Sequence, residues 1–475
     1  MDNEARPAAT STTSHAALQR MWVALGENEG HLALVAPGGE PGLQSHLPVD
    51  SLTRGAVAAA SLAAALLAAE AGDEPAGVPH VALGPDRIRT ALTSDRHFRL
   101  DGKEPPGVWA EFSGFWRCGD GWVRTHANYP HHRGRLLEML GLPTDADTAA
   151  FEDRLASLDP LQVEQQAGAV GAIAVAVRTT EEWAAHPQAE AVRGLPLITM
   201  RLLCDAEAPK RPTASNPAAP VAGIRVLDLT RVIAGPVATR TLALLGADVL
   251  RVDSPALPEV GWQHLDTGAG KRSTLLDLRQ AADRRTFDGL LSQADVVVTG
   301  YRPDALAAFG LSSEELAERH PGIVVGRISA WGGTGPWGGR RGFDSIVQAA
   351  SGIGWLESPD GHRPGALPVQ ALDHTGGYLL AAGVLSSLRR MRHEGGSRLV
   401  EVSLARLAQE LLALPREPEA VAPMPPAEPT TVTVRAPSGE ITYALPALAY
   451  EGGPTDWPAP SHPWGSDGPE WATGA

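Results

Sequence analysis

One carboxylate in this chain, Asp373, has surroundings that suit a nucleophile. It lies in residues 365–388, which read G-A-L-P-V-Q-A-L-D-H-T-G-G-Y-L-L-A-A-G-V-L-S-S-L. The Ala- and Leu-rich residues 377–390 predict a buried helix, so Asp373 stands at or just before its first turn. Free N–H groups and the positive end of the helix dipole favour negative charge there. Gly376 and Gly377 permit close approach of an acyl group. Their backbone N–H groups could also stabilise an oxyanion. The alternative interpretation is that Asp373 only caps the helix.

A weaker copy of this stretch lies near the N-terminus. Residues 47–67 read L-P-V-D-S-L-T-R-G-A-V-A-A-A-S-L-A-A-A-L-L. Alignment of the apolar residues places Thr53 where Asp373 stands, whereas alignment of the helices slips the register by about two residues. In the second register Asp50 or Ser51 approaches the position of Asp373. We interpret this stretch as a degenerate copy that lacks the nucleophile.

The composition limits the classes of function. A length of 475 residues predicts two or three domains, and a net charge of −15 without a basic block argues against a nucleic-acid partner. Cys118 and Cys204 have no CxxC spacing, which argues against a disulfide scaffold and structural zinc. The Ala-rich residues 56–71 indicate a buried helix rather than a membrane span. Residues 1–20 are polar, so we expect a disordered N-terminus, no membrane partner and a cytoplasmic protein.

The rest of the N-terminal half carries mixed helix and strand patterns. Residues 21–35 predict two short strands joined by a turn, and residues 120–141 predict a strand, a loop and an amphipathic helix. Thr179 or Thr180 could cap a following helix. Three histidines lie in the second of these regions, and without a nearby carboxylate or cysteine at metal spacing we interpret them as solvated rather than as metal ligands: His126, His131 and His132.

The C-terminal half begins with an alternating pattern of strand, helix and strand. A proline-rich linker, 205–222, precedes a strand over 224–230, a turn and helix over 231–247, and a strand over 248–253. This βαβ unit predicts a doubly wound parallel sheet. Three more strands follow within residues 270–279, 294–303 and 321–332.

Basic side chains stand at or beside the later strands, and at the carboxyl ends of parallel strands they would bind an anionic ligand. They are Lys271, Arg272, Arg302 and Arg327. Each could instead be an ordinary surface charge. The turn after the first strand reads A-G-P and not G-x-G-x-x-G, so Asp253 is weak support for a nicotinamide-dependent enzyme.

Several motifs in fixed order resemble the family III CoA-transferases, the group that also contains the formyl-CoA and carnitine CoA-transferases and the α-methylacyl-CoA racemases. The motifs are V-L-D-L-T-R-V-I-A-G-P (226–236), L-L-G-A-D-V-L-R-V-D (244–253), G-K-R-S-T-L-L-D-L (270–278), Y-R-P-D-A-L-A-A-F-G-L (301–311), G-G-T-G-P-W-G-G-R-R-G-F-D-S-I-V-Q-A-A-S-G (332–352) and the stretch around Asp373. Together they cover about residues 221–410.

The resemblance implies a Rossmann-like α/β domain with a smaller α+β domain, and an enzyme that moves CoA from an acyl-CoA to a carboxylic acid. It implies that Asp373 is the nucleophile, that CoA enters as a substrate with no permanently bound cofactor or metal, and that a homodimer is possible. Residues implied or expected to contact CoA are Ala234, Gly235, Pro236, Arg251, Lys271, Arg272, Arg302 and Arg327. Racemases of the family have a histidine where this chain has Phe343, which cannot move a proton.

The order of the parts differs from that of a typical member, and two fused, incomplete copies explain it. We expect an N-terminal lobe over 21–204 with the small domain, the linker 205–222, a Rossmann-like domain over 223–412, a second Pro-rich linker over 413–440 and a closing segment over 441–475. Two alternatives remain: a catalytically weak or inactive acyl-CoA-binding paralogue, and an acyl-CoA racemase or isomerase.

Overall fold

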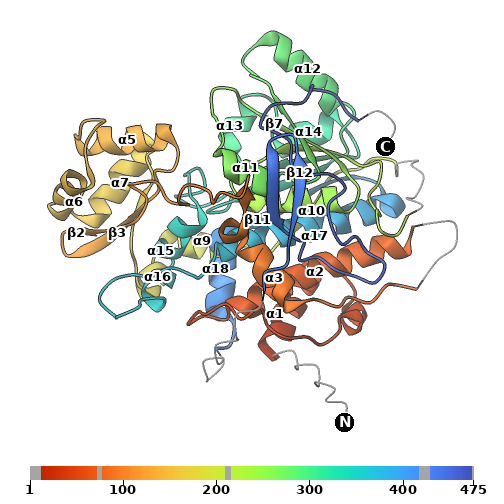
Figure 1. Ribbon diagram of the computed structural model, residues 1–475, viewed down its shortest axis with the longest axis horizontal. Coiled ribbons are helices and arrows are strands. Elements are labelled where there is room, and N and C mark those ends of the chain that lie inside the picture. The colour runs from red at the N-terminus through yellow and green to blue at the C-terminus, as the bar shows by residue number, and fades with distance from the viewer. Residues whose placement is uncertain (1–11, 72–76, 209–215, 417–427, 473–475) are drawn as a thin grey trace.

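The computed structural model describes residues 12–71, 77–208, 216–416 and 428–472. Its centre is a seven-stranded sheet in the order β5-β11-β10-β9-β6-β7-β8, in which every pairing is parallel except that of the edge strand β5 with β11 (Figure 1). The strands are β5 (Thr199–Cys204), β6 (Arg225–Leu229), β7 (Asp248–Asp253), β8 (Lys271–Leu275), β9 (Val296–Thr299), β10 (Val324–Ser329) and β11 (Ser397–Ser403). The structure therefore contains the predicted doubly wound parallel sheet.

Helices cover both faces of this sheet because its strands carry apolar residues on both sides. Val226 and Val298 face a core that includes α10 (Ala234–Leu244) and α17 (Ala371–Glu394). Leu227 faces a second core that includes α12 (Ala281–Leu291) and α14 (Ser313–Arg319). The predicted helix after the first strand is α10, and the helix predicted at 377–390 is the longer α17.

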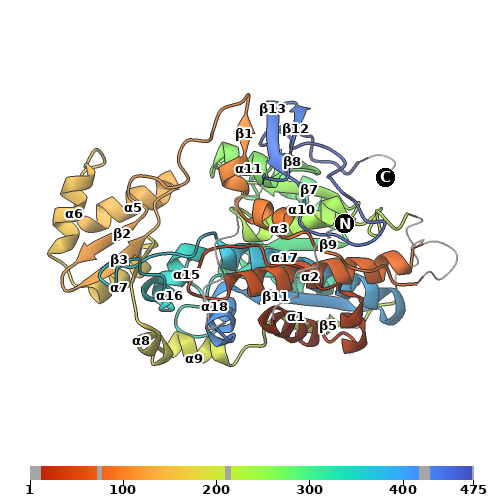
Figure 2. The same cartoon turned by 60° about the horizontal axis from the view of Figure 1, so that its bottom comes forward.

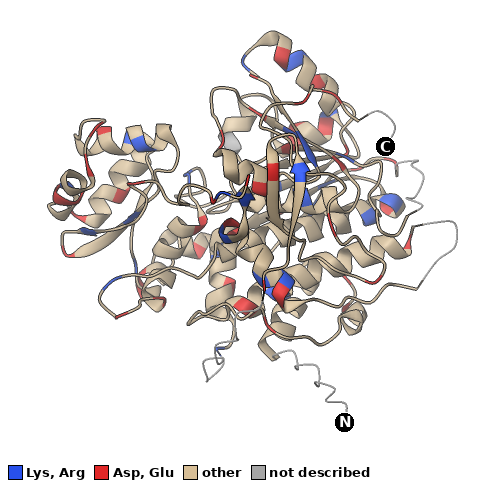
Figure 3. Ribbon diagram, viewed as in Figure 1, with Lys and Arg blue, Asp and Glu red and all other residues tan. Residues whose placement is uncertain are grey.

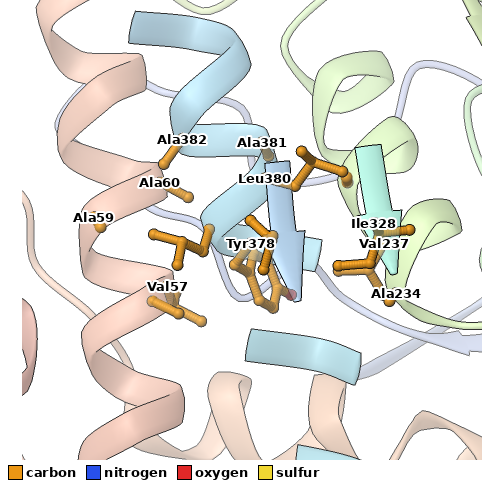
Figure 4. Packing of buried hydrophobic residues seen from close by; sticks show 14 of the residues in the cluster. Val57, Ala59, Ala60, Ala234, Val237, Ile328, Tyr378, Leu380, Ala381 and Ala382 are labelled. Carbon is orange, nitrogen blue, oxygen red and sulfur yellow. The ribbon is translucent and has the colours of Figure 1, made fainter. Parts of the chain in front are cut away.

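The N-terminal helices form a further layer over α17. α2 (Val49–Ala69) packs along α17, and α1 (Thr12–Ala24) packs on α2 (Figure 2). Small residues make the close approach possible, since Ala60 of α2 lies opposite Ala382 of α17 (Figure 4). Among the described residues, only α2 is long and apolar enough to cross a membrane, and its apolar window is wholly buried inside the protein.

A smaller lobe stands beside the main body and has its own core (Figure 1). It contains an antiparallel sheet of β2 (Phe115–Cys118), β3 (Gly121–Thr125) and β4 (Ala174–Ala176), covered by α5 (Pro130–Leu140), α6 (Thr148–Ala156) and α7 (Pro160–Val170). Phe151 of α6 stacks on Phe112 within this core. Strands β3 and β4 contact α15 (Asp344–Ala350) of the main body, which fixes the lobe against the sheet.

A third sheet joins distant parts of the chain. It pairs β1 (Arg99–Leu100) with β13 (Gly439–Ala444) and β13 with β12 (Thr431–Ala436). The remaining elements are η1 (Glu29–Leu34), α3 (Pro85–Leu92), α4 (Ser94–His97), α8 (Thr180–Ala184), α9 (Pro187–Arg193), α11 (Gly261–Thr267), α13 (Pro303–Ala307), α16 (Ile353–Leu356) and α18 (Leu404–Ala413). Basic and acidic residues are scattered over both lobes (Figure 3).

Three local predictions were wrong. Residues 12–20 are helical rather than disordered, and residues 21–35 form the end of α1 and a 3₁₀ turn rather than two strands. Met21 and Trp22 are fully buried in the core shared with α2, so long-range packing stabilises this helix. Strand β12 lies inside the predicted linker 413–440, of which 417–427 is outside the described residues, as are 1–11 of the N-terminus.

Candidate active site

A cleft of about 610 Å³ runs along the carboxyl ends of the parallel strands. That edge is where open α/β sheets bind ligands. Its walls contain the residues at or after the ends of β6, β7, β8, β9 and β10, together with Asp373 and residues of the small lobe: Leu229, Asp253, Leu276, Tyr301, Arg302, Ile328, Tyr129, His131, His132 and Arg135 among others. Both lobes of one chain therefore line the same cleft.

Asp373 lies in the first turn of α17, on the wall of this cleft. The N-cap residue Gln370 makes no capping hydrogen bond with its side chain. Asp344 of α15 replaces it, because the backbone N–H of Asp373 donates to Asp344 Oδ2 over 2.9 Å. The other carboxylate oxygen of Asp344 accepts a hydrogen bond from the Gln348 side chain. The free N–H groups expected at this helix start are thus satisfied from another element, and the side chain of Asp373 is left to face the cleft.

Two buried carboxyl groups therefore stand next to each other. Burial raises the pKa of Asp344 to about 6, against the hydrogen bonds that favour its charged form. Burial and then the charge of Asp344 raise the pKa of Asp373 well above its usual range. Two such groups cannot both be ionised cheaply, and the hydrogen-bond donors around Asp344 favour the charged form of Asp344 over that of Asp373.

The small lobe contributes a positive charge near this pair. Arg124 of β3 is buried, its charge favours the ionised form of Asp344, and its guanidinium stacks over the rings of Trp109 and Phe115 at 4.6 and 4.7 Å. Burial lowers the pKa of Arg124 to about 10, which leaves it charged at neutral pH. Residues more than two hundred positions apart in sequence therefore set the charge balance at Asp373.

An aromatic wall separates the two lobes next to the nucleophile. Phe343 stacks on His126 with the ring centroids 3.8 Å apart, and His132 meets Phe343 edge-on. His126 and His132 are buried, and burial lowers their pKa values to about 3 and about 2, so both are neutral. The interpretation of these two histidines as solvated was wrong, because the sequence does not reveal that Phe343 covers them. In the described part of the chain no group of histidine, cysteine and acidic residues is arranged to hold a metal ion.

The A-G-P turn after β6 is shaped by packing. A Cβ on Gly235 would lie only 2.3 Å from Thr230 Cβ, so only glycine fits at this point. Val232 in the same turn has φ 72°, an unusual conformation for a β-branched residue. This turn brings Arg231, Val232, Ala234 and Gly235 to the cleft wall.

The structure divides the predicted CoA-contacting residues into two groups. Ala234, Gly235, Arg302 and Arg327 line the cleft, and Arg327 also pairs with Glu401 at 3.2 Å. Pro236 is buried in α10 and is absent from the cleft wall.

Three predicted basic residues belong to ion pairs in the protein interior or at the opposite edge of the sheet. Lys271 Nζ donates to Asp228 and Thr239 beneath α10, and Arg272 pairs with Asp248 at the amino ends of β7 and β8. Arg251 bridges Asp253 and Glu259 with 2% of its side chain exposed. None of the three lines the cleft, so the structure gives no support to their predicted contact with CoA.

Gly376 and Gly377 serve packing between helices. A Cβ on Gly377 would lie 2.6 Å from the carbonyl oxygen of Ala234 in α10, and one on Gly376 would lie 3.1 Å from Ile328. Both glycines are more than one residue past the first turn, where the backbone N–H points to the carbonyl four residues back. They let α17 approach the sheet and α10 closely, and the structure gives no support to their predicted role with an oxyanion.

Sequence reasoning missed the residues that complete the site. Asp344 and Arg341 both lie in the motif R-R-G-F-D (340–344), in which only Phe343 is interpreted from the sequence. Tyr129 donates to Glu259, which also accepts from Arg231, and this joins the small lobe to the cleft wall. The signal available in the sequence was the acidic and basic content of that motif.

Comparison with known proteins agrees with this arrangement. Residues 221–425 match the model of CoA-transferase family III. The match spans β6 to α18, which includes Asp344 and Asp373.

Individual relatives match part of this chain. A probable fatty acyl-CoA transferase, Rv3272, from Mycobacterium tuberculosis is 34% identical over 213 residues, which cover 42% of this chain and 54% of that protein. The human succinyl-CoA:glutarate CoA-transferase is 30% identical over 197 residues, with 39% and 45% covered. The crystal structure of Rv3272 superposes with a TM-score of 0.38 at 34% identity, covering 41% of this chain and 58% of that one. The chain thus spans about half the length of the curated relatives it matches.

Proposed function

We propose that this protein is a CoA-transferase that moves CoA from an acyl-CoA to a carboxylic acid, with Asp373 as the nucleophile. The observation that carries the proposal is the position of Asp373. It is a carboxylate at a helix start, on the wall of a cleft at the carboxyl edge of a parallel sheet, inside the region that matches the family.

The reaction balances without an external energy source. The Asp373 carboxylate attacks the thioester carbonyl, the C–S bond breaks, and CoA leaves as a thiolate. The product on the protein is an acyl-aspartyl anhydride. The thiolate then attacks the carboxyl carbon of Asp373, which releases the donor acid and leaves an aspartyl-CoA thioester. The acceptor carboxylate attacks the aspartyl-CoA thioester, which releases the CoA thiolate and forms a second anhydride. The thiolate then attacks the acceptor's acyl carbon, so the new acyl-CoA departs and the Asp373 carboxylate is restored.

The neighbouring residues support this chemistry. Asp344 fixes the backbone of the first turn by accepting the N–H of Asp373. Phe343 and the neutral His126 and His132 close the cleft on the small-lobe side, which keeps water from the anhydride and the thioester. Because both lobes come from one chain, we propose one complete site per polypeptide, whether or not the chain forms a homodimer.

The acyl groups in the names of the relatives differ widely. The relatives include a probable fatty acyl-CoA transferase, an acetyl-CoA:oxalate CoA-transferase from Acetobacter aceti and the human succinyl-CoA:glutarate CoA-transferase. We propose an acyl-CoA and a carboxylic acid as the substrates of this chain, with CoA as substrate and not as a resident cofactor.

An identity exchange tests the function without knowledge of the natural pair. A transferase with an aspartyl-CoA intermediate exchanges an acyl-CoA with its own free acid. The protein is incubated separately with acetyl-, glutaryl- and octanoyl-CoA, each with its ¹³C-labelled acid, and label in the CoA ester is followed by mass spectrometry. We expect exchange with at least one pair and none with Asp373→Asn. CoA binding without exchange in all three pairs contradicts the proposal and favours an acyl-CoA binder.

A further inference from the structure

The small lobe is attached to the main body in a way that favours motion. The chain enters the lobe once, after β1, and leaves it once, after β4, and the lobe has a core of its own (Figure 2). Such a unit moves relative to its neighbour unless a strong contact holds it in place. The contacts between the lobe and the main body therefore determine whether the cleft is closed before a ligand binds.

The lobe packs against α15 near the place where the chain leaves the lobe. Strands β3 and β4 contact this helix, and the N–H of Arg178, shortly after β4, donates to the carbonyl oxygen of Ala349 over 3.1 Å. His126 of the lobe stacks on Phe343, the residue before α15. Because these contacts adjoin the exit of the chain from the lobe, they fit the position of a hinge.

A buried hydrogen bond attaches the lobe at a second place, beyond the end of β7. Tyr129, the N-cap residue of α5, donates its hydroxyl to Glu259 Oε1 over 2.5 Å. In the sheet, β9 and β6 separate β7 from β10, which precedes α15, so this attachment is distinct from the hinge contacts. Tyr129 is 5% exposed and the Glu259 side chain 1%, so water does not compete for the bond.

Two arginines of the main body keep Glu259 charged. Arg251 Nη2 donates to Glu259 Oε2 over 2.7 Å, and Arg231 Nε donates to the same oxygen over 3.3 Å. Burial opposes the charge, but Arg251 and then Arg231 lower the pKa of Glu259 to about 2. Burial and then the charge of Glu259 raise the pKa of Tyr129 well above its usual range. The bond therefore joins a protonated hydroxyl to a carboxylate across the physiological pH range, which makes it a strong one.

The acceptor is also fixed from behind. Arg251, which holds Glu259, pairs with Asp253 over 2.7 Å, and Trp464 of the closing segment donates its indole N–H to Asp253 over 2.9 Å. Glu259 is thus held by several groups of the main body and cannot follow Tyr129. Any movement of the lobe away from β7 must break the bond between Tyr129 and Glu259.

We propose that Tyr129 and Glu259 form a latch that holds the small lobe in its closed position without a ligand, so that CoA esters enter a cleft that is already formed. The cleft of about 610 Å³ is present with the bond made, and Tyr129 lies on its wall. Tyr129 is then a positioning residue, which raises affinity for the ligand by fixing the lobe. The latch goes beyond the proposed transferase function, because it concerns the protein before any substrate binds.

The distance between two spin labels, one on each lobe, tests the latch. The labels are attached to Glu152→Cys in α6 and Glu318→Cys in α14, both exposed positions, in the full chain with Cys204→Ser and the buried Cys118 unchanged. Pulsed electron paramagnetic resonance should give a narrow distance distribution that free CoA does not change. Tyr129→Phe, which removes only the hydroxyl, should give a broad distribution that CoA narrows. Its Kd for CoA should rise about tenfold, as for a closed fraction of about one tenth.

A matched control removes the same hydroxyl group from a tyrosine within the main body. Tyr443 donates to Asp456 Oδ1 over 3.1 Å, so Tyr443→Phe should change neither the distance distribution nor the Kd. A narrow distribution in Tyr129→Phe without CoA overturns the inference and leaves the transferase proposal standing. A broad distribution in the labelled protein without further change, or equal broadening by Tyr443→Phe, also overturns it. Failure of that protein to bind CoA counts against the transferase proposal, while the spectra without ligand still decide the latch.

Discussion

The helices α2 and α17 begin in the same way. Pro48 before α2 has φ −74° and ψ 57°, and Gln370 before α17 has φ −75° and ψ 66°. In both helices the first N–H turns back to the carbonyl two residues before it. Aligning these starts pairs Ser51 with Asp373, which is the second of the two registers considered from the sequence.

Their packing also corresponds. Gly55 of α2 lies against the backbone of α1, as Gly377 of α17 lies against that of α10. α2 and α17 then pack on each other, so that the pair α1 and α2 lies against the pair α17 and α10. This arrangement fits the interpretation of the chain as two fused copies.

The two starts differ in what covers them. At α2 the carboxylate is Asp50, whose two oxygens accept the N–H groups of Gly42 and Leu43, each over 2.9 Å. A loop therefore closes over that end, and Arg54, which occupies the position of Gly376, is buried. At α17 Asp344 accepts the N–H of Asp373 itself, and the Asp373 side chain lies on the cleft wall. The comparison teaches that a helix start becomes a candidate active site when another residue satisfies its N–H groups.

The largest expected effect follows from removing the open carboxylate. Asp373→Asn should lower CoA transfer about a thousandfold or more, because the amide cannot form the anhydride. Ser51→Ala, the same position in α2, should leave the rate within a factor of two or so. Initial rates of label exchange measure both. A similar loss in the two variants would remove the distinction between the helix starts.

The glycine contacts should differ in their effect on stability. Gly377→Ala should destabilise by about 1–3 kcal/mol because its Cβ would lie 2.6 Å from a fixed carbonyl oxygen. Gly55→Ala meets its nearest atom at 3.1 Å and gains up to about 1 kcal/mol of helix propensity, so it should be near neutral. Urea unfolding of both variants gives the comparison. An equal loss in the two would show that α2 is packed as tightly as α17.

The raised pKa of Asp373 should appear in the pH dependence of stability. Its pKa is raised in the folded state, so the wild type loses stability as pH rises through that pKa. Asp373→Asn lacks this loss and should have the higher Tm at pH 8, with the difference shrinking toward pH 5. Ser51→Ala serves as the control, with a Tm difference that does not depend on pH. A constant difference for Asp373→Asn would contradict the raised pKa.

A smaller effect is expected from the neighbouring carboxylate. Asp344→Asn keeps an oxygen for the Asp373 N–H but removes the charge that raises the pKa of Asp373. Transfer requires ionised Asp373, so the acid limb of the rate profile should move to lower pH. Profiles of kcat/KM from pH 4.5 to 8 measure this shift. A shift to higher pH would assign the ionisable group to another residue.

Local patterns predicted the parts of the fold that local forces decide. The βαβ unit of β6, α10 and β7 follows its apolar pattern, and Thr179 caps α8 with Glu182 in a capping box as its spacing suggested. The helix at Met21 and Trp22 was missed because its stability comes from packing on α2. Lys271 was misplaced since the sequence does not show that Asp228 and Thr239 enclose it.

The candidate site was predictable in its centre and not in its surroundings. Asp373 could be found because a carboxylate before a small-residue helix is visible in the sequence. Its partner Asp344 and the stacked ring of His126 depend on contacts between elements 29 or more residues apart, or between lobes. Such contacts leave no periodic signal in a single sequence.

Trapping of the covalent intermediate tests the central claim most directly. The protein is incubated with a CoA ester that supports exchange, quenched with hydroxylamine, digested and analysed by peptide mass. We predict an aspartyl hydroxamate at Asp373 in the peptide from the start of α17, absent without the ester, and no modification in the peptide that contains Asp50 and Ser51. Exchange activity with an unmodified Asp373, or with label at the start of α2, would contradict the account.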